Sequence, residues 1–245
     1  RWAYGAVQIL RAHARALFSH SDERLTRGQR YHFVAGWLPW LADGLNLVFT
    51  IAALVWSFAM IVAPHLSDPP LIMFSALPLS LFTFKLVKLA HLYAARVGAN
   101  IRQTLAAALA GLALSHTIGV AVVKALFTRN QPFFRTPKSK QPHALVEGFA
   151  AARTESLMLI AILLAALGLT RQIALGPHLL VGIPEELRGP DVSVWVAVLL
   201  IQAVPYAAAV LVSLVSALSM PARWLGPSPC GFGLSRTLEQ TEKSG

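Results

Sequence analysis

Long apolar runs separated by short polar stretches dominate the chain. The runs 44–64 and 192–222 contain no Asp, Glu, Lys or Arg. A helix needs about 20 apolar residues to cross the hydrocarbon core of a bilayer, and both runs reach that length. Two further spans are predicted at 69–95 and 144–170. In the first of them, Lys85 and Lys88 are expected to reach toward the membrane interface. The pattern therefore predicts about four transmembrane helices.

The composition supports lipid as the solvent. Hydrophobic residues make up 56% of the 245 residues, and charged residues only 13%. A soluble domain usually has roughly 25% charged residues, so this chain has too few to cover a water-facing surface. A single cysteine, Cys230, excludes an internal disulfide framework and a Cys-rich zinc site. We predict an all-α membrane protein whose partner is the lipid bilayer.

The segment 103–123 is also uncharged, but it differs from the predicted spans. It is rich in Ala and Gly, and Gly111, Ser115 and Gly119 recur every fourth residue. Such a stripe of small residues lets helices pack closely. Basic residues lie on both sides of the segment, and positive charge gathers on the cytoplasmic side of membrane proteins. We therefore expect this segment to lie in plane or to be re-entrant rather than to span.

The same rule predicts the topology. Loop 65–70 has no Lys or Arg and is expected to be external, as is loop 171–191, and both termini are expected to be cytoplasmic. The net charge of +10 then reflects topology, so we expect no nucleic-acid partner. The predicted regions are interfacial amphipathic helices and a loop (1–42), two transmembrane helices with an in-plane helix (43–127), a cytoplasmic loop (128–143), two transmembrane helices (144–222) and a cytoplasmic tail (223–245).

The first eighteen residues have the pattern of an amphipathic helix. Arg1, Tyr4, Gln8, Arg11 and Arg15 share one face at helical spacing, and the opposite face carries the residues Trp2, Ala6, Ile9, His13 and Leu17. A helix of this kind lies in the membrane interface. An ordinary surface helix of a further soluble domain explains the pattern equally well.

Two local patterns carry groups that suit a phosphate-bearing sugar. Arg1 can clamp phosphate through its forked donors, and the neighbouring Trp2 offers a flat face for stacking on a sugar ring. The polar loop 128–138 carries the aromatic Phe133, the hydroxyl of Thr136 and the cation of Lys138. The simpler alternatives are an aromatic interface anchor and a basic cytoplasmic loop without catalytic duty.

The two patterns, in this order, resemble membrane-integrated family 2 glycosyltransferases of the bacterial cellulose synthase type. In that family a Gln-x-x-Arg-Trp motif heads an interface helix, and Arg1-Trp2 followed by Ala3-Tyr4-Gly5 is similar to its end. The Gln is expected upstream of Arg1. The stretches 25–30 and 36–40 also look like the approach to the family's first span.

The later loop is similar to the Phe-x-Val-Thr-x-Lys gating loop of the same family. Phe133, Thr136 and Lys138 match its pattern, whereas Arg135 stands where the family often has Val. This departure concerns the detailed substrate contact, and the match at the other positions identifies the loop.

The resemblance implies roles for the matching residues. Arg1 would hold the nucleotide diphosphate, Trp2 would stack on the acceptor sugar, and Phe133, Thr136 and Lys138 would close over the nucleotide sugar. The helices would line the path of the growing polysaccharide through a bacterial inner membrane. The family's Mg²⁺ is held by carboxylates of a cytoplasmic catalytic domain. No Asp-x-Asp motif occurs in this chain, so those ligands are expected upstream, and this chain alone should be inactive.

Several polar residues of the spans have simpler interpretations. Gln202 and Tyr206, one turn apart, suit either a sugar channel or hydrogen bonding between helices. His116 has no companion ligands nearby in sequence, and Asp43 and Asn46 are expected at the interface.

A protein of another class fits the same pattern. Four spans, a helix with a small-residue stripe and basic loops also suit a helical transport or scaffold subunit that never contacts a nucleotide sugar.

Overall fold

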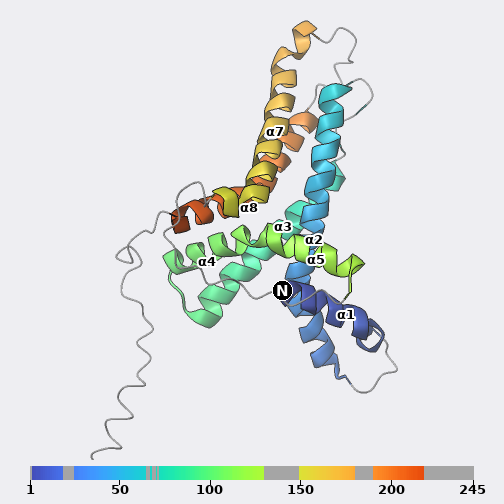
Figure 1. Cartoon of the computed structure of the whole chain (residues 1–245), viewed down its shortest axis with the longest axis vertical. Helices are drawn as coiled ribbons and strands as arrows, with labels where there is room; N and C mark the ends of the chain where they lie inside the picture. The colour runs from blue at the N-terminus through green and yellow to red at the C-terminus, as the bar shows by residue number, and fades with distance from the viewer. Residues whose placement is uncertain are drawn as a thin grey trace, which may run out of the picture.

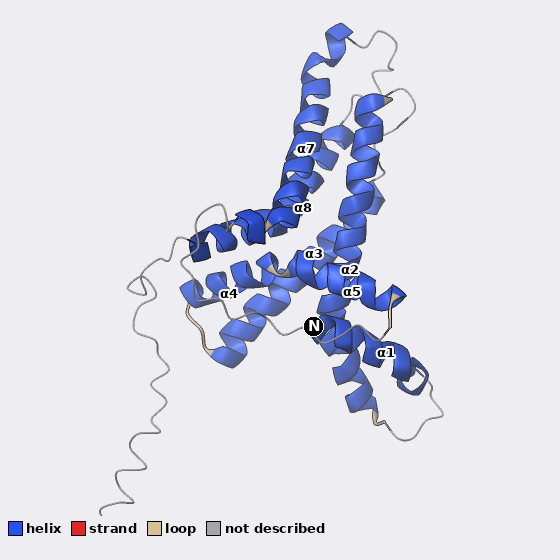
Figure 2. Ribbon diagram, in the orientation of Figure 1, coloured by secondary structure: helices blue, strands red, loops and turns tan. Residues whose placement is uncertain are grey.

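The structure, a computed structural model, describes residues 2–18, 25–64, 67, 70, 72–129, 149–179 and 190–217. In that part of the chain the regular structure is helical throughout (Figure 2). The elements are α1 (Trp2–Phe18), α2 (Arg27–Val62), α3 (Ile72–Leu92), the π-helical turn η1 (Tyr93–Val97), α4 (Ile101–Ala113), α5 (Ser115–Phe127), α7 (Arg153–Leu179) and α8 (Pro190–Ala217). The predicted all-α fold is confirmed.

Among the described residues, four helical segments are long and apolar enough to cross a membrane, and they correspond to the four predicted spans. They are Arg27–Val62, Met73–Ala95, Arg153–Ala174 and Val192–Ser216. α2 packs against α3 and α7, and α7 packs along α8, so the four form one bundle (Figure 1). α7 leaves Leu157, Ile160 and Leu164 exposed along one side, a surface suited to lipid tails. The protein is a multi-pass membrane protein.

The first spanning helix begins well before the apolar run that predicted it. Thr26 caps it: its hydroxyl accepts from the Gln29 backbone N–H at 3.2 Å, and the Gln29 side chain accepts from the Thr26 N–H at 2.9 Å. The helix then continues without interruption through Pro39. The predicted boundary between an interfacial region and a span at residue 42 therefore falls inside α2, because the helix has its own cap upstream.

A short sequence signal turns the chain between α3 and α4. The turn η1 ends at Gly98, whose φ of 64° is a left-handed conformation that glycine adopts without a steric penalty. Asn100 then caps α4, because its side chain accepts from the Gln103 N–H at 2.9 Å. The reversal is thus set locally by a glycine and a capping residue.

The uncharged segment 103–123 forms a broken helix. α4 and α5 meet at Leu114 with a bend of 41°. The Ser115 hydroxyl donates back to the Gly111 carbonyl at 3.4 Å, a contact of the kind that bends helices. The pair lies across the bundle, transverse to α2 and α7 (Figure 1). This course favours the in-plane prediction, while length and composition also fit one broken span.

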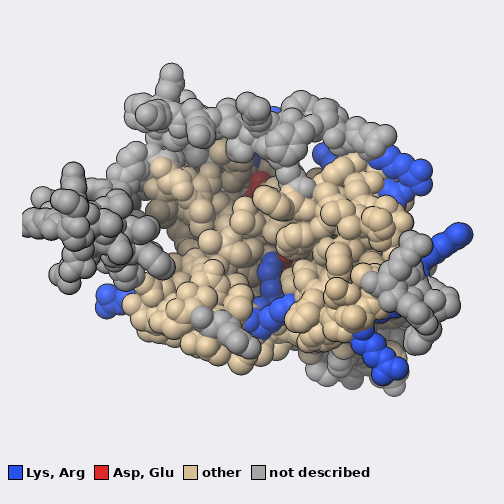
Figure 3. Space-filling view, turned by 90° about the horizontal axis from the view of Figure 1, so that it is seen from below, with Lys and Arg blue, Asp and Glu red and all other residues tan. Residues whose placement is uncertain are grey.

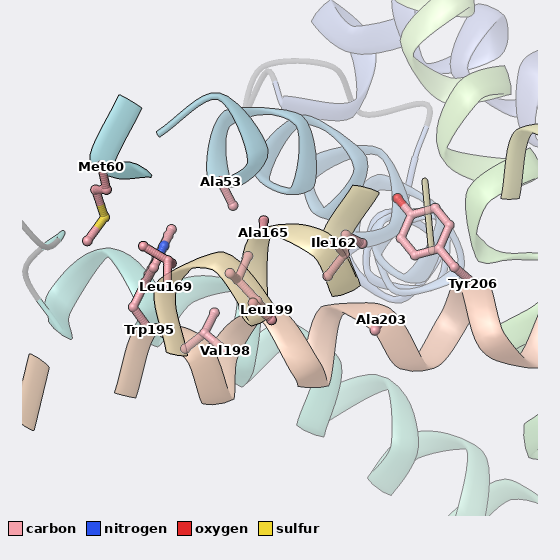
Figure 4. Packing of buried hydrophobic residues seen from close by; sticks show 11 residues of the cluster. Ala53, Met60, Ile162, Ala165, Leu169, Trp195, Val198, Leu199, Ala203 and Tyr206 are labelled. Carbon is pink, nitrogen blue, oxygen red and sulfur yellow. The ribbon is translucent and has the colours of Figure 1, made fainter. Parts of the chain in front are cut away.

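The main apolar core joins α2, α7 and α8. Small residues of α7 and α8, among them Ala165 and Ala203, let the two helices approach, and larger side chains such as Ile162, Leu199 and Trp195 fill the space between them (Figure 4). The Trp195 indole N–H donates to the buried Ser57 hydroxyl of α2 at 2.9 Å. This hydrogen bond is a polar contact that helps to fix how α8 packs against α2.

Part of the small-residue stripe predicted for 103–123 lies at the contact where α5 crosses α2. A Cβ atom placed on Gly119 would lie 2.7 Å from the Asp43 carbonyl oxygen and 3.1 Å from the Leu47 Cβ. A Cβ on Gly44 would lie 2.6 Å from Val122 Cγ1. Two glycines, one on each helix, thus allow the backbones to come close, and the prediction of close packing is confirmed at Gly119.

Substituting Gly119 tests this crossing. Gly119→Ala should lower the free energy of unfolding by about 1–3 kcal/mol, because the new methyl group meets backbone that cannot move aside. Gly36→Ala in α2 is the control, since a Cβ there meets nothing within 4 Å. Thermal unfolding of the detergent-solubilised protein measures both. Equal stability of the two variants would contradict the close crossing.

Candidate functional site

Only one of the residues singled out for substrate binding lies in the described part of the chain. Trp2 is the first residue of α1, and its side chain is 87% exposed. Arg1 and the three loop residues Phe133, Thr136 and Lys138 lie outside the described residues. The described part of the candidate site is therefore α1, which carries Trp2, and the helices that contact α1.

α1 rests on the transverse helix α5 through an apolar contact. Ala3 and Val7 of α1 are buried against Val122 and Ala125 of α5, and Trp40 of α2 packs at the edge of this cluster. The apolar face predicted for this helix divides in two, because Ala6 is buried whereas Trp2 and Ile9 are exposed. One side of α1 thus binds the bundle, and another side keeps Trp2 accessible.

The polar face of α1 contacts the C-terminal end of α5. The Gln8 side-chain amide donates to the Ala125 and Thr128 carbonyls at 2.8 and 2.9 Å. The Arg11 guanidinium donates to the same two carbonyls at 2.7 and 3.1 Å. The hydroxyls of Tyr4 and Thr128 lie 3.1 Å apart. This cluster, which we call the α1–α5 junction, satisfies carbonyls that a helix end leaves without partners.

The α1–α5 junction joins the two segments that the sequence analysis singled out. α1 carries Trp2 at its start, and Thr128 ends α5 at the point where the predicted cytoplasmic loop begins. More than 110 residues separate the hydrogen-bonded groups along the chain. The helix that carries Trp2 thus contacts the residue at which the predicted loop begins. Phe133, Thr136 and Lys138 themselves lie outside the described residues.

A second polar group lies inside the bundle, at the crossing of α2, α3 and α5. Lys85 Nζ lies 2.6 Å from Asp43 Oδ1 and 2.5 Å from the Ser115 hydroxyl. The Asp43 side chain is only 5% exposed. Lys85 and Asp43 each find a partner on a neighbouring helix. Their expected position near the membrane interface remains a prediction.

A related contact lies one residue further along α5. His116 Nδ1 is 2.8 Å from Glu155 Oε1 of α7, and the His116 ring centroid lies 5.6 Å from that of Tyr206 in α8. Thr50 of α2 donates to Gln202 Oε1 at 3.2 Å. Hydrogen bonding between helices is therefore the observed role of Gln202, as the simpler interpretation predicted.

These contacts place charged groups of both signs within apolar surroundings. Seen from below, the described surface is mostly uncharged, with Lys and Arg side chains toward its periphery and both signs of charge visible near its centre (Figure 3). Charged residues within spans are typical of functional sites, and here Lys85 is paired with Asp43 while Glu155 is hydrogen-bonded to His116. The partners are 42 and 39 residues apart along the chain, so sequence spacing offers no signal for either pair.

Neither group has the make-up of a metal centre. Among the described residues, no set of three or more His, Cys, Asp or Glu side chains could hold a metal ion. The prediction that Mg²⁺ ligands lie upstream of this chain remains a prediction.

Comparison with profiles of protein families, with curated proteins and with solved structures finds no match for this chain.

Removing one partner of the buried ion pair tests how far the bundle depends on it. Lys85→Met leaves the Asp43 carboxylate buried without its cation, which should lower the free energy of unfolding by about 3–5 kcal/mol. Lys88→Met is the control, since Lys88 is exposed, one turn along α3, and donates to the Ala35 carbonyl. Unfolding in SDS titrations compares the variants. An equal, small effect of both would contradict a structural role for the pair.

Proposed function

We propose that this chain is the membrane-channel part of a processive family 2 glycosyltransferase. The enzyme polymerises a β-glycan from a nucleotide sugar and exports it across a bacterial inner membrane, with both ends of this chain in the cytoplasm. Its Mg²⁺ is held by carboxylates of a catalytic domain encoded upstream.

The observation that carries the proposal is the α1–α5 junction. The two segments with the family's motif residues are far apart in sequence, yet α1 is hydrogen-bonded to the end of α5 from which the motif loop continues. An enzyme that brings an acceptor sugar and a nucleotide sugar together needs its acceptor-binding and donor-binding elements side by side. A contact between these segments is what the glycosyltransferase proposal requires.

The exposure of Trp2 fits the role proposed for it. A side chain that is 87% exposed contributes little to packing, and an indole ring presents an apolar face for stacking on a sugar. Arg1, directly before it, holds the diphosphate of the leaving nucleotide by charge-assisted hydrogen bonds. Phe133, Thr136 and Lys138 cover the nucleotide sugar, and the cation of Lys138 meets its phosphates.

The alternative is a helical transport or scaffold subunit with no glycosyltransferase role. The observation that favours it is the buried ion pair Lys85–Asp43, with the His116–Glu155 hydrogen bond close by, because paired polar groups within membrane helices are typical of transport pathways. The protein sequence upstream of Arg1 discriminates between the two. A Gln three residues upstream and a preceding soluble domain with an Asp-x-Asp motif support the enzyme, and a further hydrophobic run supports the transporter.

Trp2→Ala tests the acceptor contact in the intact enzyme. Polymer synthesis should fall below about a tenth of the parent rate, because the acceptor loses the ring on which it stacks. Incorporation of radiolabelled sugar by membrane vesicles gives the rate, and resistance to alkaline extraction shows membrane insertion. Ile9→Ala, an exposed apolar residue of the same helix, is the control. Normal polymer yield from Trp2→Ala would exclude acceptor stacking.

Lys138→Ala tests the donor contact. The KM for the nucleotide sugar should rise about tenfold, the effect expected when one charge-assisted hydrogen bond to phosphate is lost. Lys140→Ala removes a lysine two residues further on, outside the motif, and should leave the KM unchanged. If the two variants have the same kinetics, the loop serves only to connect two helices.

A further inference from the structure

The polar face of α1 has an unusual orientation for an amphipathic helix at a membrane. Gln8 and Arg11 are only partly exposed, and both donate to main-chain carbonyls of another helix. Their spacing of three residues places them on one side of α1, so both side chains reach the same helix end. The role of this face is therefore to attach α1 to α5.

The four hydrogen bonds at this attachment converge on two acceptors. Gln8 and Arg11 each donate to the Ala125 carbonyl and to the Thr128 carbonyl, at distances between 2.7 and 3.1 Å. The Ala125 carbonyl belongs to the last turn of α5, where the helix dipole concentrates negative charge, and Thr128 is the extended capping residue that follows this turn. A guanidinium is a fixed cation with donors in a rigid fork, so it meets this end in a defined geometry.

The apolar contact between α1 and α5 cannot define that geometry alone. Ala3 and Val7 are small, and their packing against Val122 and Ala125 has no directional component. A helix held by such contacts can rotate or slide along its partner. The hydrogen bonds of Gln8 and Arg11, together with the contact between the Tyr4 and Thr128 hydroxyls, select one rotation and one axial position of α1.

That selection determines where the Trp2 ring points. Trp2 is 87% exposed, so its own contacts do not fix it. It lies six residues before Gln8 on the same uninterrupted helix, a rise of about 9 Å, over which a helix is stiff. A rotation of α1 on α5 would turn the ring away by the same angle.

We infer that Gln8 and Arg11 are positioning residues for Trp2, which fix the direction of the acceptor-stacking ring through the C-terminal end of α5. The inference rests on the proposed function for the role of Trp2, whereas the mechanical link between Trp2 and α5 stands on the contacts alone.

The link is measured first, without activity. Spin labels are attached to cysteines at position 2 and at the exposed Thr117 of α5, in a Cys230→Ser background. Adding Arg11→Ala or Gln8→Ala should broaden the distance distribution between the labels severalfold, because α1 gains rotational freedom. Arg15→Ala, an exposed arginine one turn further along α1, should leave the distribution narrow. Equal distributions in all variants would overturn the positioning role.

Activity is then measured in the intact enzyme in membrane vesicles. Arg11→Ala and Gln8→Ala should each shorten the polymer and lower kcat about three- to tenfold, with the KM for the nucleotide sugar unchanged, because the acceptor is misplaced while the donor site is intact. Arg11→Lys, which keeps charge and donors, should recover most of the rate, and Arg15→Ala should match the parent. Gln8→Ala serves if Arg11→Ala does not yield a monodisperse protein.

The outcomes separate the two ideas. If the parent enzyme makes no polymer from any nucleotide sugar, the proposed function fails, and the spin-label distances still decide the link. If the parent is active and both alanine variants make polymer of normal length at the normal rate, the positioning inference fails while the proposed function stands.

Discussion

A buried ammonium group inside an apolar bundle is stable only while a carboxylate stays beside it. Lys85 and Asp43 meet this condition across two helices, and the Ser115 hydroxyl completes the coordination from a third. The backbone of Asp43 is also the surface on which Gly119 rests. The ion pair, the close crossing of α2 and α5, and the bend at Leu114 therefore share one location, and the position of α5 depends on it.

α5 connects this location with the surface of the bundle. Its thirteen residues extend over roughly 20 Å, from Ser115 and His116 at the buried end to Thr128 at the other. The buried end is held by hydrogen bonds to Lys85 of α3 and Glu155 of α7, and the far end is held by the side chains of α1. Because polar contacts fix α5 at both ends, α5 also fixes the position of α1 relative to the core of the bundle. α1 itself lies outside that core.

The parts of this architecture that the sequence predicts are those determined by local composition. An apolar run of sufficient length is a span wherever it occurs, which is why all four spans are recognised, although α2 starts at its Thr26 cap rather than at the apolar run. The partners of Lys85 and His116 cannot be predicted from local composition. Each is contributed by another helix, and only the packing of the helices decides that Asp43 and Glu155 are the ones within reach. The amphipathic pattern of residues 1–18 likewise reveals a polar face, but not that this face meets the carbonyls of α5.

The α1–α5 junction also constrains the order of assembly. α1 leaves the ribosome more than 110 residues before the helix end to which it binds. Until that helix end has been synthesised, the hydrogen bonds of Gln8 and Arg11 to it cannot form. α2, α3 and α4 are therefore synthesised before α1 can reach its final position. Docking of α1 is thus a late step of biogenesis, completed only when the last turn of α5 has formed.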